Sequence, residues 1–336
     1  MMSACAENPC GLKRVAPESM GVDTSSFHKV WNAVWGRPCD ELHALMVLKD
    51  GKIIYERYSP EMSRDTRHVL WSASKTFTAT AAGFAAQDGL LDIHDKVVSF
   101  FSEEELPCKD SLAAEDYARL QDITVENLLT MSSGFRSDII GKLMNLTENG
   151  QSWVKEALAE PVTWTPGSRF AYNSINTFLV SVIVSKVVGE PMDKYLEKKL
   201  FKPLGITDWH WEHSPEGYPT GGWGLFLNTE SFAKMGQFLL QKGTWNGKQI
   251  LNPEWIEQMT GARIIQNPDA EVEGDYNSGY GYQVWRCRHD SYRLDGAYGQ
   301  FCVEIPEKNA VVAIFEFSHD GVNTLNKMWE HIYPAL

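Results

Sequence analysis

A serine followed three residues later by a lysine can act as a nucleophile and its base, and this spacing occurs four times in the chain. On a helix, positions i and i+3 share one face, so the lysine amine would lie beside the serine hydroxyl. A buried lysine near a tyrosine or another cation can lose its proton at neutral pH and then activate the hydroxyl. The spacing alone does not choose among the copies, which are Ser26/Lys29, Ser72/Lys75, Ser152/Lys155 and Ser231/Lys234.

The copy at Ser72 and Lys75 differs from the others because a β-rich segment ends there and the first long helical segment begins. Residues 43–59 form two β-rich runs joined by an Asp-Gly pair, which predicts a hairpin. Residues 72–89 have a helical composition, and the positive end of the helix dipole would favour negative charge developing on Ser72. The other three copies are interpreted as parts of ordinary helices.

The remaining segments predict one sheet assembled from both ends of the chain, with helices inserted between. We expect a single domain over residues 1–336, with an α/β lobe of about 17–70 plus 275–336 and a mainly helical lobe of about 71–274. A cleft between the lobes would hold the site. Three runs in the last part of the chain are predicted to be antiparallel strands, followed by a closing helix: 278–288, 299–307, 309–318 and the helix 322–336.

Charge and hydropathy restrict the partners. The net charge of −13 argues against nucleic acid and anionic membranes. The first residues lack the apolar core of a signal peptide, and the longest apolar run, 177–189, is shorter than the roughly 20 residues of a bilayer span. We therefore expect a cytoplasmic protein that acts on a small molecule. The oligomeric state is not predicted.

No sequence pattern predicts a cofactor or a metal. The segment 210–213 contains His-x-x-His, but not in the order of a zinc protease, and its histidines are expected to stack with neighbouring tryptophans. The glycine-rich segment 221–224 lacks a phosphate-loop lysine and predicts a tight turn at the cleft rim, where Trp223 would shape the pocket. Residues 276–278 are interpreted as a turn. The absence of Gly-x-Ser-x-Gly argues against an α/β-hydrolase.

From about residue 17 to the end, the chain resembles the serine β-lactamase and penicillin-binding-protein superfamily, closest to class C β-lactamases and their esterase and 6-aminohexanoate-dimer-hydrolase relatives. The resemblance implies an α/β (α+β) fold of the β-lactamase/transpeptidase type, in which helices flank an antiparallel sheet. It rests on several blocks in the same order: Ser72-x-x-Lys75, LLTMSSGF (128–135), PGSRFAYNS (166–174), residues 221–251, YGYQVW (280–285) and GAYGQF (296–301).

The resemblance also implies residue roles. Ser72 would be the acylated nucleophile and Lys75 its proton partner, and Tyr172 would act with Lys75 in both acylation and deacylation. Which of the two is the general base stays open. The backbone N–H groups of Ser72 and Ala297 would form the oxyanion hole. The residues predicted to contact substrate are Asn173, Ser174, Trp223, Asp295, Gly296 and Tyr298.

Two departures from the family pattern affect the expected substrate. The family's Tyr-x-Asn is replaced by Tyr172-Asn173-Ser174, so Asn173 or Ser174 itself would supply the polar contact. The family's Lys-Thr-Gly or His-x-Gly aligns with Leu294-Asp295-Gly296, which offers no cation for a substrate carboxylate, and Asp295 would repel one. A neutral or cationic ester or amide therefore suits the site better than a β-lactam.

The leading hypothesis is a metal-independent serine hydrolase that cleaves carboxylic esters or small amides through an acyl-enzyme on Ser72. A β-lactamase or D-amino-acid peptidase is the alternative within enzymes. A non-catalytic protein that binds a ligand or cell-wall fragment is the alternative from another class. The presence of Ser72, Lys75 and Tyr172 together argues against the last.

Overall fold

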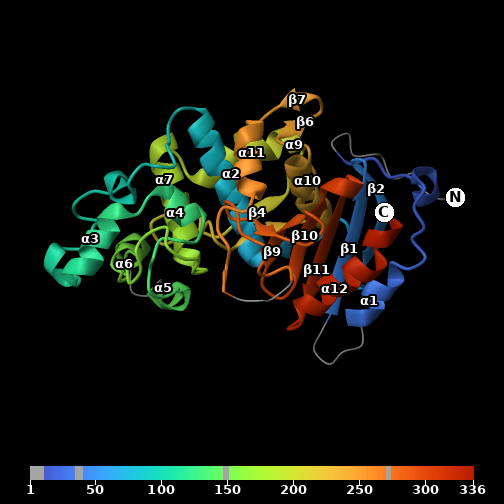
Figure 1. Cartoon of the computed structure of the whole chain (residues 1–336). Helices are drawn as coiled ribbons and strands as arrows, with labels where there is room; N and C mark the ends of the chain where they lie inside the picture. Colours follow the sequence, from blue (N-terminus) through green and yellow to red (C-terminus); the bar gives the residue numbers. More distant parts are fainter. Residues whose placement is uncertain (1–10, 35–40, 147–150, 270–273) are drawn as a thin grey trace.

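The computed structural model describes residues 11–34, 41–146, 151–269 and 274–336. Within these residues lies a six-stranded antiparallel sheet with the order β2-β1-β11-β10-β9-β8, in which strands from both ends of the chain lie side by side (Figure 1). This order confirms the predicted sheet. Its strands are β1 (Glu41–Lys49), β2 (Lys52–Tyr58), β8 (Trp285–Arg286), β9 (Tyr292–Gly296), β10 (Gln300–Ile305) and β11 (Ala310–Phe317).

The first two strands form the predicted hairpin, whereas the segment 278–288 departs from its prediction. Only Trp285 and Arg286 of that segment form a strand, and β9 comes from residues that follow it. Gly281 explains the difference. A Cβ there would lie 1.9 Å from the carbonyl oxygen of Met259, so the chain packs closely against the end of α11 (Pro253–Thr260).

Helices cover both faces of the sheet (Figure 1). The helices α1 (His28–Val34) and α12 (Gly321–His331) lie on one face, and α10 (Thr229–Leu240) packs on the other against β1, β10 and β11. Along β11, Val312 joins the core under α1 and α12, whereas Val311 and Ala313 join the core on the other face. Because successive side chains point to opposite faces, a strand covered on both sides is apolar at nearly every position.

The helical part is built around α2 (Ser74–Gln87) and α7 (Ser174–Val188), which pack against each other. The helix α7 is apolar on all sides and buried over most of its length, as expected inside a core. No single described helix has the length and apolar character of a membrane span, although α7 and residues 192–204 pass that test as a pair bent by 71°. The surrounding helices are α3 (Ala114–Asp122), α4 (Val125–Leu129), α5 (Ile140–Leu146), α6 (Trp153–Leu158), α8 (Met192–Leu196) and α9 (Lys202–Leu204).

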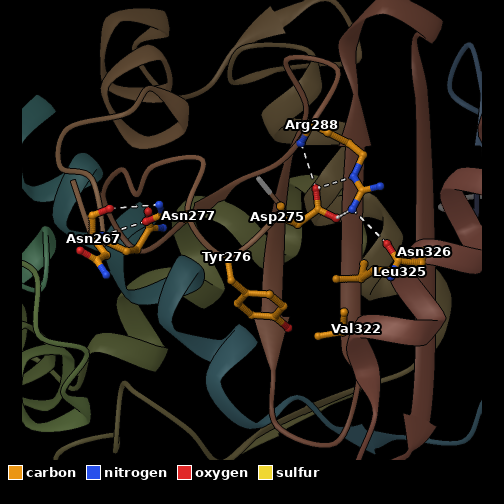
Figure 2. Close-up of a pocket in the computed structure, with 10 residues that line it drawn as sticks. Asn267, Asp275, Tyr276, Asn277, Arg288, Val322, Leu325 and Asn326 are labelled. Carbon is orange, nitrogen blue, oxygen red and sulfur yellow. Dashed lines mark hydrogen bonds and ion pairs between the residues drawn. The ribbon is translucent and has the colours of Figure 1, made fainter. Parts of the chain in front are cut away.

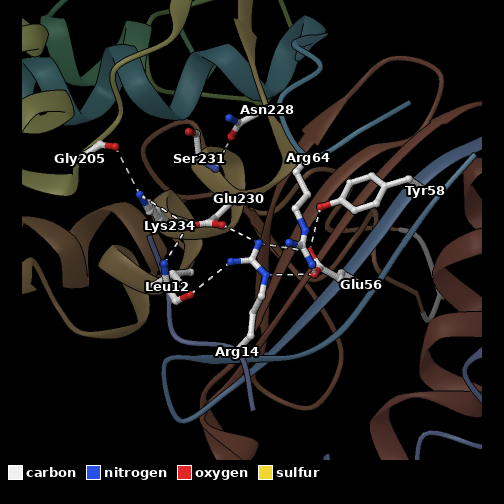
Figure 3. A network of polar contacts seen from close by, with 10 residues as sticks. All are labelled: Leu12, Arg14, Glu56, Tyr58, Arg64, Gly205, Asn228, Glu230, Ser231 and Lys234. Carbon is white, nitrogen blue, oxygen red and sulfur yellow. Dashed lines mark hydrogen bonds and ion pairs between the residues drawn. The ribbon is translucent and has the colours of Figure 1, made fainter. Parts of the chain in front are cut away.

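A polar network fastens the N-terminal segment to the sheet edge and to α10 (Figure 3). The Arg14 guanidinium lies 3.0 Å from the carboxylate of Glu56 on β2 and 2.8 Å from that of Glu230 at the start of α10. The backbone N–H of Leu12 donates to the same Glu230 carboxylate at 2.8 Å. Arg64 also pairs with Glu56. The segment therefore covers part of the edge strand β2, whose backbone would otherwise be open to pairing.

Candidate active site

Ser72 and Lys75 meet at the start of α2. Residues 71–73 form a 3₁₀ turn that leads directly into the helix. Lys75 Nζ donates to Ser72 Oγ at 3.0 Å, and Lys75 is 1% exposed whereas Ser72 is partly exposed. In two other copies of the motif the serine makes structural contacts: Ser26 Oγ donates to the last carbonyl of α12, and Ser152 Oγ accepts the N–H of Lys155 at the start of α6.

Three further groups surround the amine of Lys75. It donates to the carbonyl oxygen of Gly222 at 2.7 Å and to Ser174 Oγ at 3.3 Å, and it lies 5.0 Å from the centre of the Tyr172 ring. A Cβ at position 222 would lie 3.1 Å from the carbonyl oxygen of Ser174, a tight contact that glycine avoids. The glycine-rich turn predicted at the cleft rim therefore contributes a backbone acceptor, which sequence reasoning did not identify.

Burial separates the proton affinities of the two candidate bases. Burial lowers the pKa of Lys75 to about 7, against the opposing influence of the Asp138 and Asp295 carboxylates. Burial raises the pKa of the Tyr172 phenol well above its ordinary value, and a hydrogen bond with Ser72 only partly opposes this rise. At neutral pH the phenol therefore keeps its proton, whereas the amine can lose one.

Aromatic side chains hold Tyr172 in place. Its ring lies 5.6 Å from that of Trp285 and 6.3 Å, edge to face, from that of Tyr280. Trp285 and Tyr280 are themselves 5.1 Å apart. The block YGYQVW, which carried part of the family resemblance, therefore forms the wall behind the phenol.

Gln283 in the same block connects the helices that carry the site. Its carbonyl oxygen accepts from Thr76 Oγ1 of α2 at 2.7 Å, and its side-chain oxygen accepts from Thr177 Oγ1 of α7 at 2.6 Å. Its side-chain amide donates to the carbonyl of Leu129 at the end of α4 at 2.8 Å. Gln283 is 2% exposed, so these bonds are shielded from water and fix α2 relative to α7.

The turn between β9 and β10 brings Ala297 and Tyr298 beside the turn that carries Ser72. A Cβ on Gly296 would lie 2.1 Å from the carbonyl oxygen of Leu70, so the two backbones touch and only glycine fits. The side-chain amide of Gln300 donates to the carbonyl of Ala297 at 3.1 Å and steadies the turn. The oxyanion role of Ala297 stays a prediction, and this contact supplies the proximity that it requires.

The two candidates for the missing asparagine take different places. Asn173 caps α7, because its side-chain oxygen accepts the N–H of Ile175 at 3.0 Å while its amide donates to the Ser137 carbonyl at 2.8 Å. Ser174 instead contacts Lys75 through its hydroxyl, and its backbone N–H donates to the Asp138 carboxylate at 2.8 Å. Of the two alternatives, Ser174 therefore supplies the polar contact to the amine. Asp138 was not identified from the sequence, since it matches none of the blocks used.

Trp223 does not lie where the sequence analysis placed it. Its side chain is 4% exposed and packs in the core, with its ring 5.9 Å from that of Trp153, so it cannot line the cleft as predicted. The neighbouring histidines also differ from expectation: His210 lies 5.7 Å from Phe226, and His213 lies 3.3 Å from the Asp193 carboxylate. Among the described residues, no group of three potential metal-ligating side chains gathers.

The third motif carries an ion pair whose cation is fully buried. Leu294 is fully buried in the core, whereas the Asp295 carboxylate lies 2.8 Å from Nε of the fully buried Arg293. Burial raises the pKa of Asp295, and Arg293 and Tyr276 act in the opposite direction. The predicted repulsion of a substrate carboxylate by Asp295 is therefore reduced, because a guanidinium compensates much of the charge.

The sequence analysis did not identify Arg293 or Tyr276 as members of this cluster. Arg293 lies two positions before Asp295 on a strand, so the two side chains share a face, and this spacing could have identified the pair. Tyr276 was interpreted only as part of a turn, yet its ring lies 4.3 Å from the Arg293 guanidinium. No local pattern marks it, because the contact depends on how the loop folds back over β9.

Beyond Tyr276 lies a cavity of about 540 Å³, between the loop 274–277 and the start of α12 (Figure 2). Arg288 pairs with Asp275 across one wall, at 3.1 Å, and Val322 and Leu325 supply apolar surface on another. Tyr276 belongs both to this cavity and to the ion-pair cluster next to the site.

Comparison with known proteins places these observations in a family. A sequence profile of the beta-lactamase family matches residues 43–326. A provisionally named D-alanyl-D-alanine carboxypeptidase of Escherichia coli (strain K12) is 23% identical over 283 residues, which cover 64% of this chain and 64% of the relative. The chain thus spans less than two thirds of that relative's length.

Solved structures share the fold at low identity. The octameric penicillin-binding protein homologue from Pyrococcus abyssi is 22% identical with a TM-score of 0.70, over 91% of this chain and 75% of that one. A D-stereospecific amidohydrolase from Streptomyces sp. is 18% identical with a TM-score of 0.69, over 92% and 98%. EstCE1, a hydrolase with promiscuous acyltransferase activity, is 17% identical with a TM-score of 0.71, over 92% and 98%. The fold prediction is confirmed, closeness to class C stays a prediction, and the chain belongs to the beta-lactamase family of serine hydrolases.

Proposed function

We propose that this chain hydrolyses carboxylic esters or small amides through an acyl-enzyme on Ser72. The observation that carries the proposal is the buried amine of Lys75, which has a pKa of about 7 and lies 3.0 Å from Ser72 Oγ. A neutral amine at this distance can take the hydroxyl proton, which is the step that turns serine into a nucleophile.

Acylation follows from this geometry. Ser72 Oγ forms a bond to the substrate carbonyl carbon while its proton passes to Lys75 Nζ. Negative charge develops on the carbonyl oxygen, which the N–H groups of Ser72 and Ala297 would stabilise. Collapse of the intermediate breaks the bond to the leaving oxygen or nitrogen, and that atom takes the proton from Lys75.

Deacylation reverses these roles with water. A water molecule gives a proton to Lys75 as its oxygen bonds to the acyl carbon, and Ser72 Oγ leaves with that proton. The acid is released and Ser72 is regenerated. We assign the general base to Lys75, because the pKa shifts leave the amine able to accept a proton and keep Tyr172 as a neutral phenol that can pass one on.

The residues of the third motif favour a substrate without an essential carboxylate. Leu294 is buried, and the nearby cation, Arg293, is fully buried and already paired with Asp295. Neither offers an exposed positive charge to a substrate. D-amino-acid peptidase activity is the second candidate, because the curated relative described above is provisionally named as such a carboxypeptidase.

The decisive experiment compares the purified protein with Ser72→Ala on a nitrophenyl acetate, a chromogenic cephalosporin and a D-alanyl anilide. We expect ester turnover that the substitution abolishes, together with a covalent adduct on Ser72 after treatment with a fluorophosphonate. Ser152→Ala is the matched control, since it alters another Ser-x-x-Lys copy that only caps α6, and it should retain turnover. Turnover mainly of the cephalosporin or the anilide would overturn the ester assignment, and absence of both turnover and labelling would favour a binding protein.

A further inference from the structure

Three exposed aromatic side chains form a continuous surface beside Ser72. Trp71 and Tyr298 are each 37% exposed, and Phe317 at the end of β11 is 41% exposed. The rings of Trp71 and Tyr298 meet edge to face at 5.6 Å, and those of Tyr298 and Phe317 stack at 4.8 Å. We call Trp71, Tyr298 and Phe317 the aromatic platform.

Two residues of the platform are chain neighbours of residues assigned to the proposed reaction. Trp71 directly precedes Ser72, and Tyr298 directly follows Ala297. The two turns that carry these residues touch, since Gly296 packs against the carbonyl of Leu70. A substrate whose carbonyl lies at Ser72 could therefore extend over the rings without leaving the protein surface.

The backbone at these positions is unfavourable for such residues. Trp71 has φ of 47° and Tyr298 has φ of 63°, a left-handed conformation that bulky side chains rarely adopt. Each of the two side chains still leaves 37% of its surface exposed, and Asn or Gly would form the same turns with less strain. The combination of strain and exposure indicates that the rings serve contacts made outside the folded chain.

We propose that the aromatic platform binds an apolar alkyl or aryl group of the substrate and so makes the enzyme selective for hydrophobic esters. This inference rests on the proposed function and adds the substrate class. Flat aromatic faces contact alkyl chains and aromatic rings through dispersion and removal of water, with no need for a charged partner. Phe317 extends the surface away from Ser72, which favours a group longer than acetyl.

The test measures chain-length preference in two ester series, one with a lengthening acyl group and one with a lengthening alcohol. Phe317→Ser and Tyr298→Asn should each lower the ratio of kcat/KM for the eight-carbon ester to that for the two-carbon ester by about fivefold or more in at least one series, as expected from the loss of one ring face. Tyr298→Phe should restore the ratio. Leu90→Ser removes another exposed apolar side chain, 45% exposed and outside the platform, and should leave the ratio unchanged.

A binding measurement separates this proposal from the function on which it rests. In a Ser72→Ala background, the eight-carbon ester should bind more tightly than the two-carbon ester by tryptophan fluorescence, and Phe317→Ser should remove the difference. Ester turnover with an unaltered preference in both platform variants would overturn the platform proposal alone. Variants that change self-association in sedimentation but not ester binding would identify the surface as a subunit contact and would also overturn it.

Discussion

Lys75 contacts Ser72 from the protein interior, with Nζ 3.0 Å from Oγ, 1% of the lysine exposed and the serine partly exposed. The two side chains thus lie in different environments. The serine is open to substrate, whereas the lysine is removed from water, which lowers the affinity of its amine for a proton. In the proposed mechanism, burial of Lys75, rather than a neighbouring histidine, activates this serine at neutral pH.

The first prediction concerns the pH dependence of turnover. Because burial lowers the pKa of Lys75 to about 7 and the neutral amine is the base, kcat/KM should rise with pH and level off above about 7. Lys75→Met should lower kcat by on the order of 10³-fold and remove this limb. The profile is measured between pH 5 and 9, and an activity that is already maximal at pH 5 would contradict the role of a neutral amine.

A second prediction concerns the two carboxylates that oppose the lowering of the Lys75 pKa. Asp138 and Asp295 both raise the pKa of Lys75, with Asp138 the larger of the two influences. Asp138→Asn should therefore lower that pKa further and move the rising limb of kcat/KM to lower pH. Asp110→Asn, at an exposed site distant in sequence from these groups, is the matched control and should leave the limb in place. A limb that moves to higher pH would show that Asp138 does not act on the amine through its charge.

A third prediction concerns the contact between the two turns. In Gly296→Ala, the new Cβ would lie 2.1 Å from the Leu70 carbonyl oxygen, so the β9–β10 turn must move away from Ser72. We expect a loss of about 2 kcal/mol or more in unfolding free energy and a fall in kcat larger than any change in KM. Gly141→Ala is the control, because a Cβ there meets no atom within 4 Å. Equal effects of the two substitutions on kcat would contradict the importance of this contact.

The sequence was most informative where spacing is local. Ser72 and Lys75 are one helical turn apart, so a helix alone brings them together, and the order of the blocks supplied Tyr172. The sequence was least informative in irregular segments, because no periodicity there indicates which way a side chain points. Trp223 follows the glycine that contacts Lys75 yet packs in the core.

Long-range packing accounts for the other differences. The segment 278–288 has the composition of a strand, but the close approach of Gly281 to the end of α11 keeps most of it out of the sheet. The Asp138 contact to the start of α7 joins residues 36 positions apart, which a single sequence does not reveal. The candidate reactive groups were therefore easier to predict from the sequence than the charged groups that surround them.

The last prediction concerns a contact between two histidines, His43 on β1 and His68, four residues before Ser72 in the chain. Nε2 of His68, on β3 (His68–Val69), lies 2.8 Å from Nδ1 of His43. The other ring nitrogen of His68, Nδ1, lies 3.0 Å from the carbonyl oxygen of Val69. Its ring stacks on Phe315 at 4.7 Å. Burial lowers the pKa of His68 to about 4, the Val69 contact opposes the shift and His43 adds to it. The nearby Glu41 lies 3.5 Å from His43, not against His68.

The sign of the effect follows from the direction of this shift. The unfolded chain binds a proton at His68 below pH of about 6.5, whereas the folded protein does so only near 4, so protons favour unfolding between these values. The unfolding free energy should therefore be full above pH 6.5 and fall by up to about 3 kcal/mol as the pH drops to 4. Urea unfolding of His68→Gln should show a shallower fall, whereas the exposed His94→Gln should match the wild type. A wild-type slope in His68→Gln would show that this ring does not titrate with folding.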